Sequence, residues 1–191
     1  MCTRRLRRRG FTLIELVVFI TIVGIATGGV LLAYDHAVRG SADPIVRKQA
    51  LAIAESLLEE IQQMPFTYCD PDDPAASQAT SAAVCAIPET AGPEAGETRY
   101  SAATPFDNVN DYGGATSGAP GFSMAPIRDL TDVAITGLGA YTASVTLTDV
   151  PGGTLPGVPA GEALLLTVTV TGPSNVSVTL DSYRTRYAPR L

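Results

Sequence analysis

The stretch "RRRGFTLIELVVFI", residues 7–20, joins a basic segment to a run of apolar residues and places one carboxylate, Glu15, inside that run. A carboxylate in the middle of a bilayer costs roughly 2.5–3.5 kcal/mol on insertion scales. An ordinary membrane span has no reason to carry this cost. We therefore expect either that a partner neutralises Glu15 or that the segment serves a purpose other than spanning lipid.

The charges of the chain are unevenly distributed. The 191 residues have a formal net charge of −6. Five of the 13 basic residues lie in the first ten positions, which hold no acidic residue: Arg4, Arg5, Arg7, Arg8 and Arg9. The remainder therefore carries −11, five lower than the whole chain, and it contains no Trp. Because nucleic-acid binding needs basic surface and stacking rings, we exclude nucleic acid as a partner.

Residues 11–34 predict a membrane-spanning helix that follows a basic leader, residues 1–10. The 19 residues from Leu16 to Tyr34 carry no charge. As a helix they would reach about 28 Å, close to the hydrocarbon thickness of about 30 Å. The positive-inside rule places the leader in the cytoplasm and the rest of the chain beyond the membrane. We expect a single span.

Residues 35–65 predict an amphipathic helix. Its apolar residues recur at spacings of three and four: Val46, Ala50, Ile53, Leu57, Ile61 and Met64. Asp43 can cap a helix and Pro44 can occupy the first helical position, so we expect one long helix or two nearly collinear helices, with a kink or break near Gly40–Pro44. Pro65 marks the C-terminal end.

Residues 66–191 predict a domain of loops followed by a sheet. Turn-forming residues dominate positions 67–135, where we expect short elements. From Tyr141 onward, polar and apolar residues alternate with a period of two over residues 141–148, 164–171 and 176–181. This pattern predicts three antiparallel strands with one buried face, which the stripe of the preceding helix can cover. The expected fold class is α+β.

The opening stretch resembles the processing site of type IV prepilins and type II secretion pseudopilins. The resemblance rests on a basic leader, then Gly10 and Phe11, with Glu15 four residues after the Phe. It implies that prepilin peptidase cleaves between Gly10 and Phe11 and that the new N-terminus of Phe11 is methylated. It also implies that Glu15 neutralises the N-terminal amine of a neighbouring subunit during assembly. An amine and a carboxylate at membrane depth lower each other's burial cost, which suits this role.

The same resemblance implies a location and a set of partners. The chain would be a single-pass protein of the bacterial inner membrane, with a cytoplasmic N-terminus and a periplasmic C-terminal domain, and it would later enter a pilus or pseudopilus. Its partners would be the prepilin peptidase and methyltransferase, other major and minor pilins or pseudopilins, and the inner-membrane assembly platform. The long helix packed on an antiparallel sheet is the fold that the resemblance implies.

Other interpretations of the N-terminus stay open. A secretory signal also has a basic n-region and an apolar h-region, and "ATG" at residues 26–28 could serve as a weak cleavage site. That interpretation leaves Glu15 unexplained. A permanent, uncleaved anchor is a second alternative. Lipid anchoring through Cys2 is disfavoured, because Cys2 precedes the apolar run and would leave with the leader.

Two later stretches, "SADPIVRKQALAIAESLLEEIQQMPF" and "FDNVNDYGG", resemble minor pilin-like proteins of the mannose-sensitive haemagglutinin (MSHA) pilus, the MshD group, and more loosely PilV-type minor pilins. This implies a subunit that initiates, primes or decorates a pilus. The alternative is a minor pseudopilin of a type II secretion system, which uses the same processing and helix. A DNA-uptake pseudopilus is more distant, since the acidic body does not suit direct DNA contact.

The residues do not suggest an enzyme. The only histidine, His36, lies beside the apolar segment without triad or metal partners nearby in the sequence, so we interpret it as an interfacial residue. No glycine-rich phosphate loop precedes a helix with a lysine. Cys69 and Cys85 do not form a CxxC pair, which gives redox or zinc chemistry little support. We expect neither catalysis nor a cofactor.

Two groups of polar residues have simple explanations. One offers oxygen atoms that could suit calcium: Asp70, Asp72, Asp73, Asp107, Asn108, Asn110 and Asp111. Their spacing does not match an EF-hand, and turn formation explains them without a metal, so calcium is the alternative. The other group, Arg184, Arg186 and Arg190, predicts a solvated C-terminal tail, with subunit contacts as the alternative.

Cys69 and Cys85 predict a disulfide. Removal of the leader would leave only these two cysteines, both beyond the span in an oxidising compartment. The segment between them, "DPDDPAASQATSAAV", is polar and poor in core residues, so burial alone cannot hold it in place. A closed loop of this length gains about 3 kcal/mol in the chain-entropy model. The alternative is a pair of free thiols.

Overall fold

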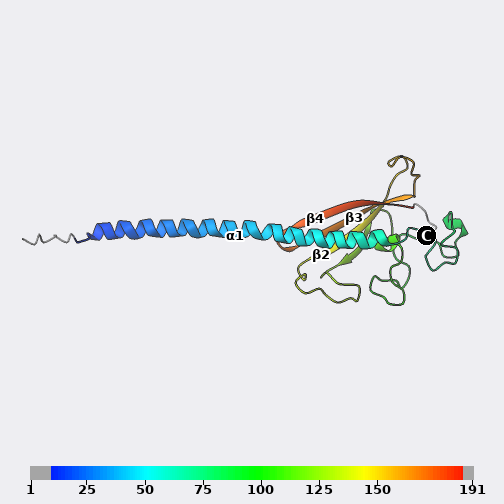
Figure 1. Cartoon of the computed structure of the whole chain (residues 1–191), viewed down its shortest axis with the longest axis horizontal. Helices are drawn as coiled ribbons and strands as arrows, with labels where there is room; N and C mark the ends of the chain where they lie inside the picture. Colours follow the sequence, from blue (N-terminus) through cyan, green and yellow to red (C-terminus); the bar gives the residue numbers. More distant parts are fainter. Residues whose placement is uncertain (1–9, 187–191) are drawn as a thin grey trace, which may run out of the picture. The chain divides into compact units, whose positions relative to one another are not determined.

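The computed structural model describes residues 10–186, and for residues 36–43 it describes the helix but not the side chains. The chain divides into two compact units, Met1–Pro44 and Ile45–Leu191. Helix α1, Leu13–Gln63, contributes to both units (Figure 1). The expected capping role of Asp43 falls outside the described side chains.

Pro44 lies inside α1, so the predicted start of a second helix at this residue is wrong. A proline inside a helix removes one backbone donor and clashes with the carbonyl four residues earlier, at a cost of roughly 3 kcal/mol. The neighbouring residues keep their own donors, so a long helix can continue through a single missing hydrogen bond. One of the two predicted arrangements, a long helix, is therefore the one observed, and it has no break near Gly40–Pro44.

The predicted stripe on the second half of α1 is confirmed. Ala50, Leu57 and Ile61 are buried, and Val46, Ile53 and Met64 are half-buried against the same cluster. Ala54, one helical turn after Ala50, is also buried. Small side chains at these two positions allow the helix backbone to approach the sheet closely. Of the charged residues between the stripe positions, Arg47, Lys48, Glu55 and Glu59 are exposed, whereas Glu60 is half-buried.

The sheet has four antiparallel strands in the order β1-β2-β3-β4. They are β1 (Pro120–Met124), β2 (Thr142–Asp149), β3 (Ala163–Thr171) and β4 (Ser177–Thr185). The three strands predicted from alternation correspond to β2, β3 and β4, which confirms the α+β class. On the outer face Thr169 pairs with Thr179, and the hydroxyl of Thr167 donates to Asp181 at 2.7 Å.

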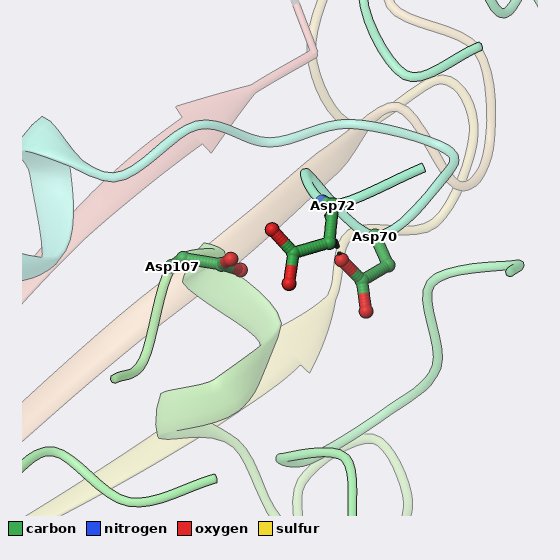
Figure 2. Close-up of side chains that lie close together, drawn as sticks. All are labelled: Asp70, Asp72 and Asp107. Carbon is green, nitrogen blue, oxygen red and sulfur yellow. Dashed lines mark hydrogen bonds between the residues drawn. The ribbon is translucent and has the colours of Figure 1, made fainter. Parts of the chain in front are cut away.

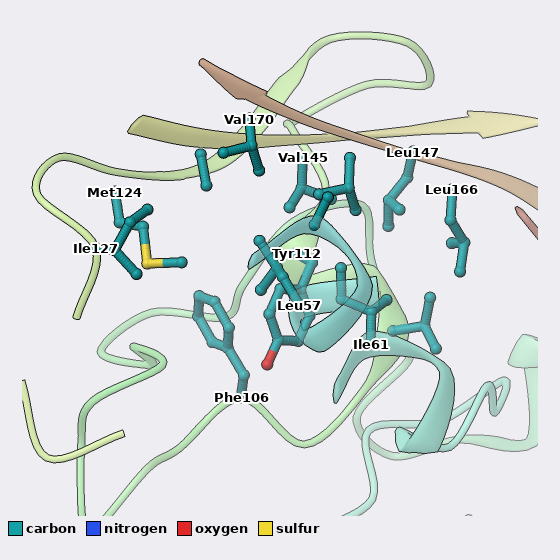
Figure 3. Packing of buried hydrophobic residues seen from close by; sticks show 14 of the residues in the cluster. Leu57, Ile61, Phe106, Tyr112, Met124, Ile127, Val145, Leu147, Leu166 and Val170 are labelled. Carbon is teal, nitrogen blue, oxygen red and sulfur yellow. The ribbon is translucent and has the colours of Figure 1, made fainter. Parts of the chain in front are cut away.

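The core lies between the sheet and α1 (Figure 3). Leu57 and Ile61 of α1 meet Val145, Leu166 and Val170 of the sheet in one cluster. Beside them, edge-to-face aromatic contacts join Phe106, Tyr112 and Phe122, with ring centroids 5.0–5.9 Å apart. Such ring pairs each contribute about 0.5–1.5 kcal/mol beyond their buried area. The aromatic residues thus fasten the loop segment to the sheet and helix.

The segment between α1 and the sheet contains short elements, as expected. Two 3₁₀ helices, η1 (Ala82–Val84) and η2 (Val109–Tyr112), precede β1, and η3 (Pro173–Asn175) joins β3 to β4. Strand β1 was not predicted, because "PGFSM" begins with the two residues least favoured in strands. It lies at the sheet edge and pairs only with β2, where proline is tolerated.

Candidate functional site

Helix α1 begins with a cap that positions Glu15. Residues Gly10 to Thr12 precede the helix, and Leu13 is its first residue. The hydroxyl of Thr12 accepts a hydrogen bond from the backbone N–H of Glu15 at 3.4 Å. Glu15 therefore occupies the third helical position, in the first turn, where the helix dipole favours a negative charge. Sequence analysis did not identify Thr12, although the spacing of Thr12 and Glu15 is typical of a capping box.

The first half of α1 presents apolar side chains to its surroundings on every face. The helical segment Leu13–Asp35 is long enough and apolar enough to cross a membrane, and none of it is buried. Its polar hydroxyls are satisfied within the helix: Thr21 donates to the carbonyl of Val18 at 2.8 Å and Thr27 to that of Val23 at 2.9 Å. Intrahelical satisfaction is what an apolar solvent requires of polar groups. This half of α1 fits a single-pass membrane anchor.

A buried ion pair joins α1 to the loop segment. The guanidinium of Arg99 donates from Nε and Nη2 to the two carboxylate oxygens of Glu60, each at 2.6 Å. The hydroxyl of Tyr112 donates to Glu60 Oε1 at 2.6 Å. Burial and the hydrogen bond to Glu60 both raise the pKa of Tyr112, so it stays a donor. Both carboxylate oxygens of Glu60 therefore accept hydrogen bonds from buried side chains, which indicates a structural role.

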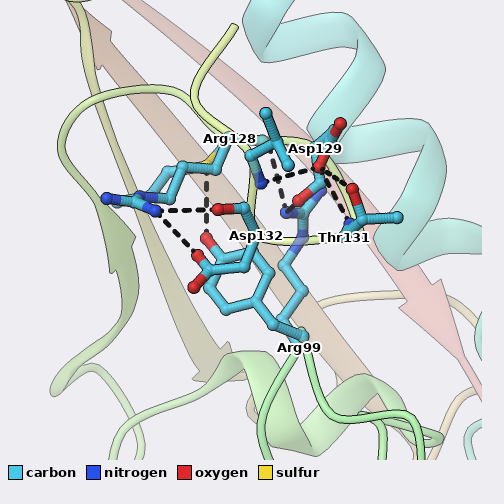
Figure 4. A network of polar contacts seen from close by, with 8 residues as sticks. Arg99, Arg128, Asp129, Thr131 and Asp132 are labelled. Carbon is cyan, nitrogen blue, oxygen red and sulfur yellow. Dashed lines mark hydrogen bonds and ion pairs between the residues drawn. The ribbon is translucent and has the colours of Figure 1, made fainter.

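Arg99 also contacts the loop that follows β1 (Figure 4). Its Nη1 donates to the carbonyls of Arg128 and Asp129, at 3.3 and 3.5 Å. Within that loop Arg128 pairs with Asp132 at 3.0 Å. Asp129 accepts from the backbone N–H of Val133 and from Thr131, and these bonds lower the pKa of its carboxyl. The network holds the loop against Arg99. The carboxylates of Asp129 and Asp132 already have partners within the loop.

Several of the oxygen-bearing residues noted in the sequence lie together. Figure 2 shows the carboxylates of Asp70, Asp72 and Asp107, whose oxygens lie within 4.8 Å of one another. Asp70 also groups with Glu94 and Glu97, and Glu94 in turn groups with Glu89 and Asp111. Sequence analysis missed the three glutamates because they lie in an irregular loop without a recognisable spacing.

Two residues of the predicted oxygen cluster have other roles. Both oxygens of Asp73 accept backbone N–H groups, from Ala75 at 2.8 Å and Ile87 at 2.6 Å, and these bonds lower the pKa of its carboxyl. The side chain of Asn108 donates to Thr67 Oγ1 and accepts from the N–H of Asn110. These two side chains stabilise turns, as the sequence analysis expected for this group.

The disulfide between Cys69 and Cys85 is present in the structure. Around it, the backbone of Tyr68 accepts from Glu89 and the backbone of Asp70 donates to Ile87, so the two ends of the loop also pair through the main chain. Cys69 is fully buried in a small cluster with Ala76 and Ala79. The cross-link therefore closes the loop directly after α1.

The prediction of a solvated arginine tail is wrong for Arg184 and Arg186. Arg184 Nη2 donates to the carbonyl of Met64 at 2.8 Å, near the end of α1. The guanidinium of Arg186 lies 4.0 Å from the ring centroid of Phe66 and 4.1 Å from that of Tyr68. Cation–π contacts hold Arg186, and the carbonyl of Met64, directly after the end of α1, holds Arg184. Cys2, the side chain of His36, and Arg190 lie outside the described residues.

Comparison with known proteins identifies one match. Residues 5–31 match the family model described as the prokaryotic N-terminal methylation motif. No curated protein and no solved structure matches the chain. The matched segment contains Gly10, Phe11 and Glu15 and the first half of the apolar helix. It supports a type IV pilin-like protein, that is, a structural subunit rather than an enzyme, which is processed by prepilin peptidase and assembles with other pilins.

Proposed function

We propose that the chain is a minor pilin-like subunit of a type IV pilus of the MSHA type. In this proposal prepilin peptidase cleaves between Gly10 and Phe11, Phe11 is methylated at its nitrogen, and Glu15 pairs with the amine of a neighbouring subunit in the filament. The single observation that carries the proposal is the carboxylate of Glu15 in the first turn of an apolar helix, within a segment that matches the methylation motif.

The position of Glu15 suits a charge that is neutralised only on assembly. In the single subunit the helix N-terminus favours the carboxylate of Glu15, but it contributes at most about 1–2 kcal/mol. Insertion of a carboxylate into the bilayer costs more than that. Cleavage before Phe11 would create an amine close to membrane depth. Pairing of this amine with Glu15 of another copy would lower the cost of both charges.

The exposed apolar surface of α1 supports the same sequence of events. Leu13–Asp35 has no buried side chains within its own unit, so it needs an apolar environment at every stage. Lipid supplies that environment before assembly. A bundle of the same helices from other subunits would supply it afterwards. The transfer is then close to neutral in hydrophobic free energy, because apolar area is covered in both states.

The resemblance of residues 41–66 and 106–114 to minor pilins of the MSHA system supports the choice of a pilus. A minor pseudopilin of a type II secretion system is the alternative, because it shares the N-terminal segment and the helix. The genes next to this one distinguish the two: a pilus locus favours the proposal, and a locus with a secretin and exported enzymes favours the alternative.

Replacement of Glu15 tests the assembly role. We expect Glu15→Leu to be retained in the membrane and cleaved, but to be depleted at least tenfold from filaments sheared off the cell surface. The matched control is Thr21→Leu, which makes the same helix more apolar but keeps the carboxylate. Quantitative mass spectrometry of sheared filaments and membranes measures both variants. Normal recovery of Glu15→Leu in filaments would contradict the proposed pairing.

A further inference from the structure

Seven carboxylates from three loop segments gather in the unit that carries the sheet. They are Asp70, Asp72, Glu89, Glu94, Glu97, Asp107 and Asp111, and they form overlapping groups of three whose ligand oxygens lie within 4.8 Å of one another. Figure 2 shows one of these groups, Asp70, Asp72 and Asp107. In the part of the chain that the structure describes, the ion pairs are Arg99–Glu60 and Arg128–Asp132, and neither includes any of these seven carboxylates. Like charges at this distance repel, so an arrangement of this kind needs a compensating positive charge or bound protons.

Asp111 belongs to one of these groups and has one unpartnered oxygen. The residue is only 1% exposed. Its Oδ2 accepts from the backbone N–H groups of Asp107 and Asn108, each at 2.8 Å, and this caps η2. Its Oδ1 is buried and has no hydrogen-bond partner. The cap therefore explains one oxygen of Asp111 and leaves the other free to bind a ligand.

Glu89 is a second buried carboxylate without partners. Both of its oxygens are inaccessible to solvent and neither accepts a hydrogen bond. A buried polar group without a partner costs about 1–3 kcal/mol, and a charged group costs more. Burial, followed by repulsion from Glu94, raises the pKa of Glu89 to about 9. Burial likewise raises the pKa of Asp111 to about 6. No turn, cap or ion pair explains why Glu89 is held here.

We propose that Glu89, Glu94 and Asp111 bind one divalent cation, and that this cation is calcium. Their ligand atoms lie within 4.8 Å of one another, as they must around one ion with Ca–O distances of about 2.3–2.6 Å. All three ligands are oxygens, which disfavours zinc. Magnesium usually takes one or two carboxylates and keeps its waters, whereas calcium accepts several carboxylates in irregular geometry.

The bound ion would fasten the loops that follow α1. Glu89 follows the disulfide loop, Glu94 lies further along the same segment, and Asp111 belongs to η2. Asp70 lies next to the buried Cys69 and shares a group with Glu94, so its charge would also be offset. Calcium would act together with the disulfide to hold this irregular segment against the sheet. The inference is independent of the assembly role proposed above.

Thermal unfolding of the full chain in detergent tests the proposal, with calcium chloride as the only added ligand. Far-UV circular dichroism is recorded at pH 7 in 2 mM calcium chloride or in EDTA, and isothermal titration calorimetry gives the stoichiometry. We expect the wild-type midpoint to be at least 5 °C higher in calcium, with one ion bound.

Glu89→Gln is the decisive variant, since the side chain keeps its shape but no longer offers a carboxylate to the ion. We expect it to lose the response to calcium. Glu94→Gln, on a half-buried loop position, should weaken calcium binding at least tenfold. Glu59→Gln, an exposed residue of α1, is the control and should respond like the wild type. Equal midpoints of the wild type in calcium and EDTA, or an unchanged response in Glu89→Gln, would overturn the proposal.

Discussion

At the scale of single residues, the second unit is held together by polar contacts that the sequence does not reveal. Arg99 is 39 residues from Glu60 in the chain, yet its two-point contact with that carboxylate is almost fully enclosed. Nothing in the local pattern around either residue indicates the pairing, because an isolated charge in a sequence is usually solvated. Partners separated by irregular loops become visible only once the chain has folded.

We expect Glu60→Ala to lower the free energy of unfolding by about 3–5 kcal/mol, because it leaves the buried Arg99 charge without its carboxylate partner. Tyr112 loses the acceptor for its hydroxyl in the same variant. The neighbouring Glu59 is exposed, so Glu59→Ala should change stability by less than about 0.5 kcal/mol. Urea unfolding of the full chain in detergent measures both. Similar losses in the two variants would show that the ion pair contributes nothing specific.

The disulfide gives a second prediction at this scale. Cys85 is half-buried whereas Cys69 is enclosed, so Cys85→Ser breaks the bridge with less disturbance of packing. We expect a loss of about 3 kcal/mol from the reopened loop. As the control, reduction of the wild type should lower its unfolding midpoint as much as the Cys85→Ser substitution does. An unchanged midpoint after reduction would mean that the main-chain pairing around the bridge already holds the loop.

At the scale of elements, the alternation of polar and apolar residues and the helical periodicity predicted most of the helix and strand positions. Val145 on β2 and Val168 on β3 could be assigned to the buried face because the residues on either side of each are serine or threonine. The stripe from Val46 to Met64 was equally clear. Strand β1 was missed because its register depends on β2 rather than on its own residues, and that register shifts between Pro120 and Ser123. Loop carboxylates such as Glu89 gave no periodic signal.

Gly121 determines how closely β1 approaches η2. A Cβ atom at this position would lie 2.2 Å from the carbonyl oxygen of Tyr112 and 2.6 Å from the carbonyl carbon of Gly113. Both are backbone atoms, so Gly121→Ala should destabilise the fold by about 1–3 kcal/mol. Gly139→Ala is the control, because that Cβ would meet nothing within 4 Å. If thermal unfolding finds the two variants equally stable, β1 and η2 can separate without cost.

At the scale of the whole molecule, the two units use their apolar residues in opposite ways. The second unit buries them between α1 and the sheet, with the aromatic residues and the disulfide holding the loops in place. The described part of the first unit buries none. A chain that keeps 23 helical residues uncovered, Leu13–Asp35, needs lipid or other subunits around them. This contrast underlies the proposal of a subunit that is first anchored and then assembled.

The most direct test of the central claim is the mass of the N-terminal peptide of the mature protein, purified from membranes of the bacterium that produces it. The account predicts a peptide that begins at Phe11 and carries one methyl group on its nitrogen. Gly10→Leu should abolish this product and leave the leader attached, because the bulky side chain would block the peptidase. A wild-type peptide that retains the leader, or one that begins after Gly28, would contradict the account.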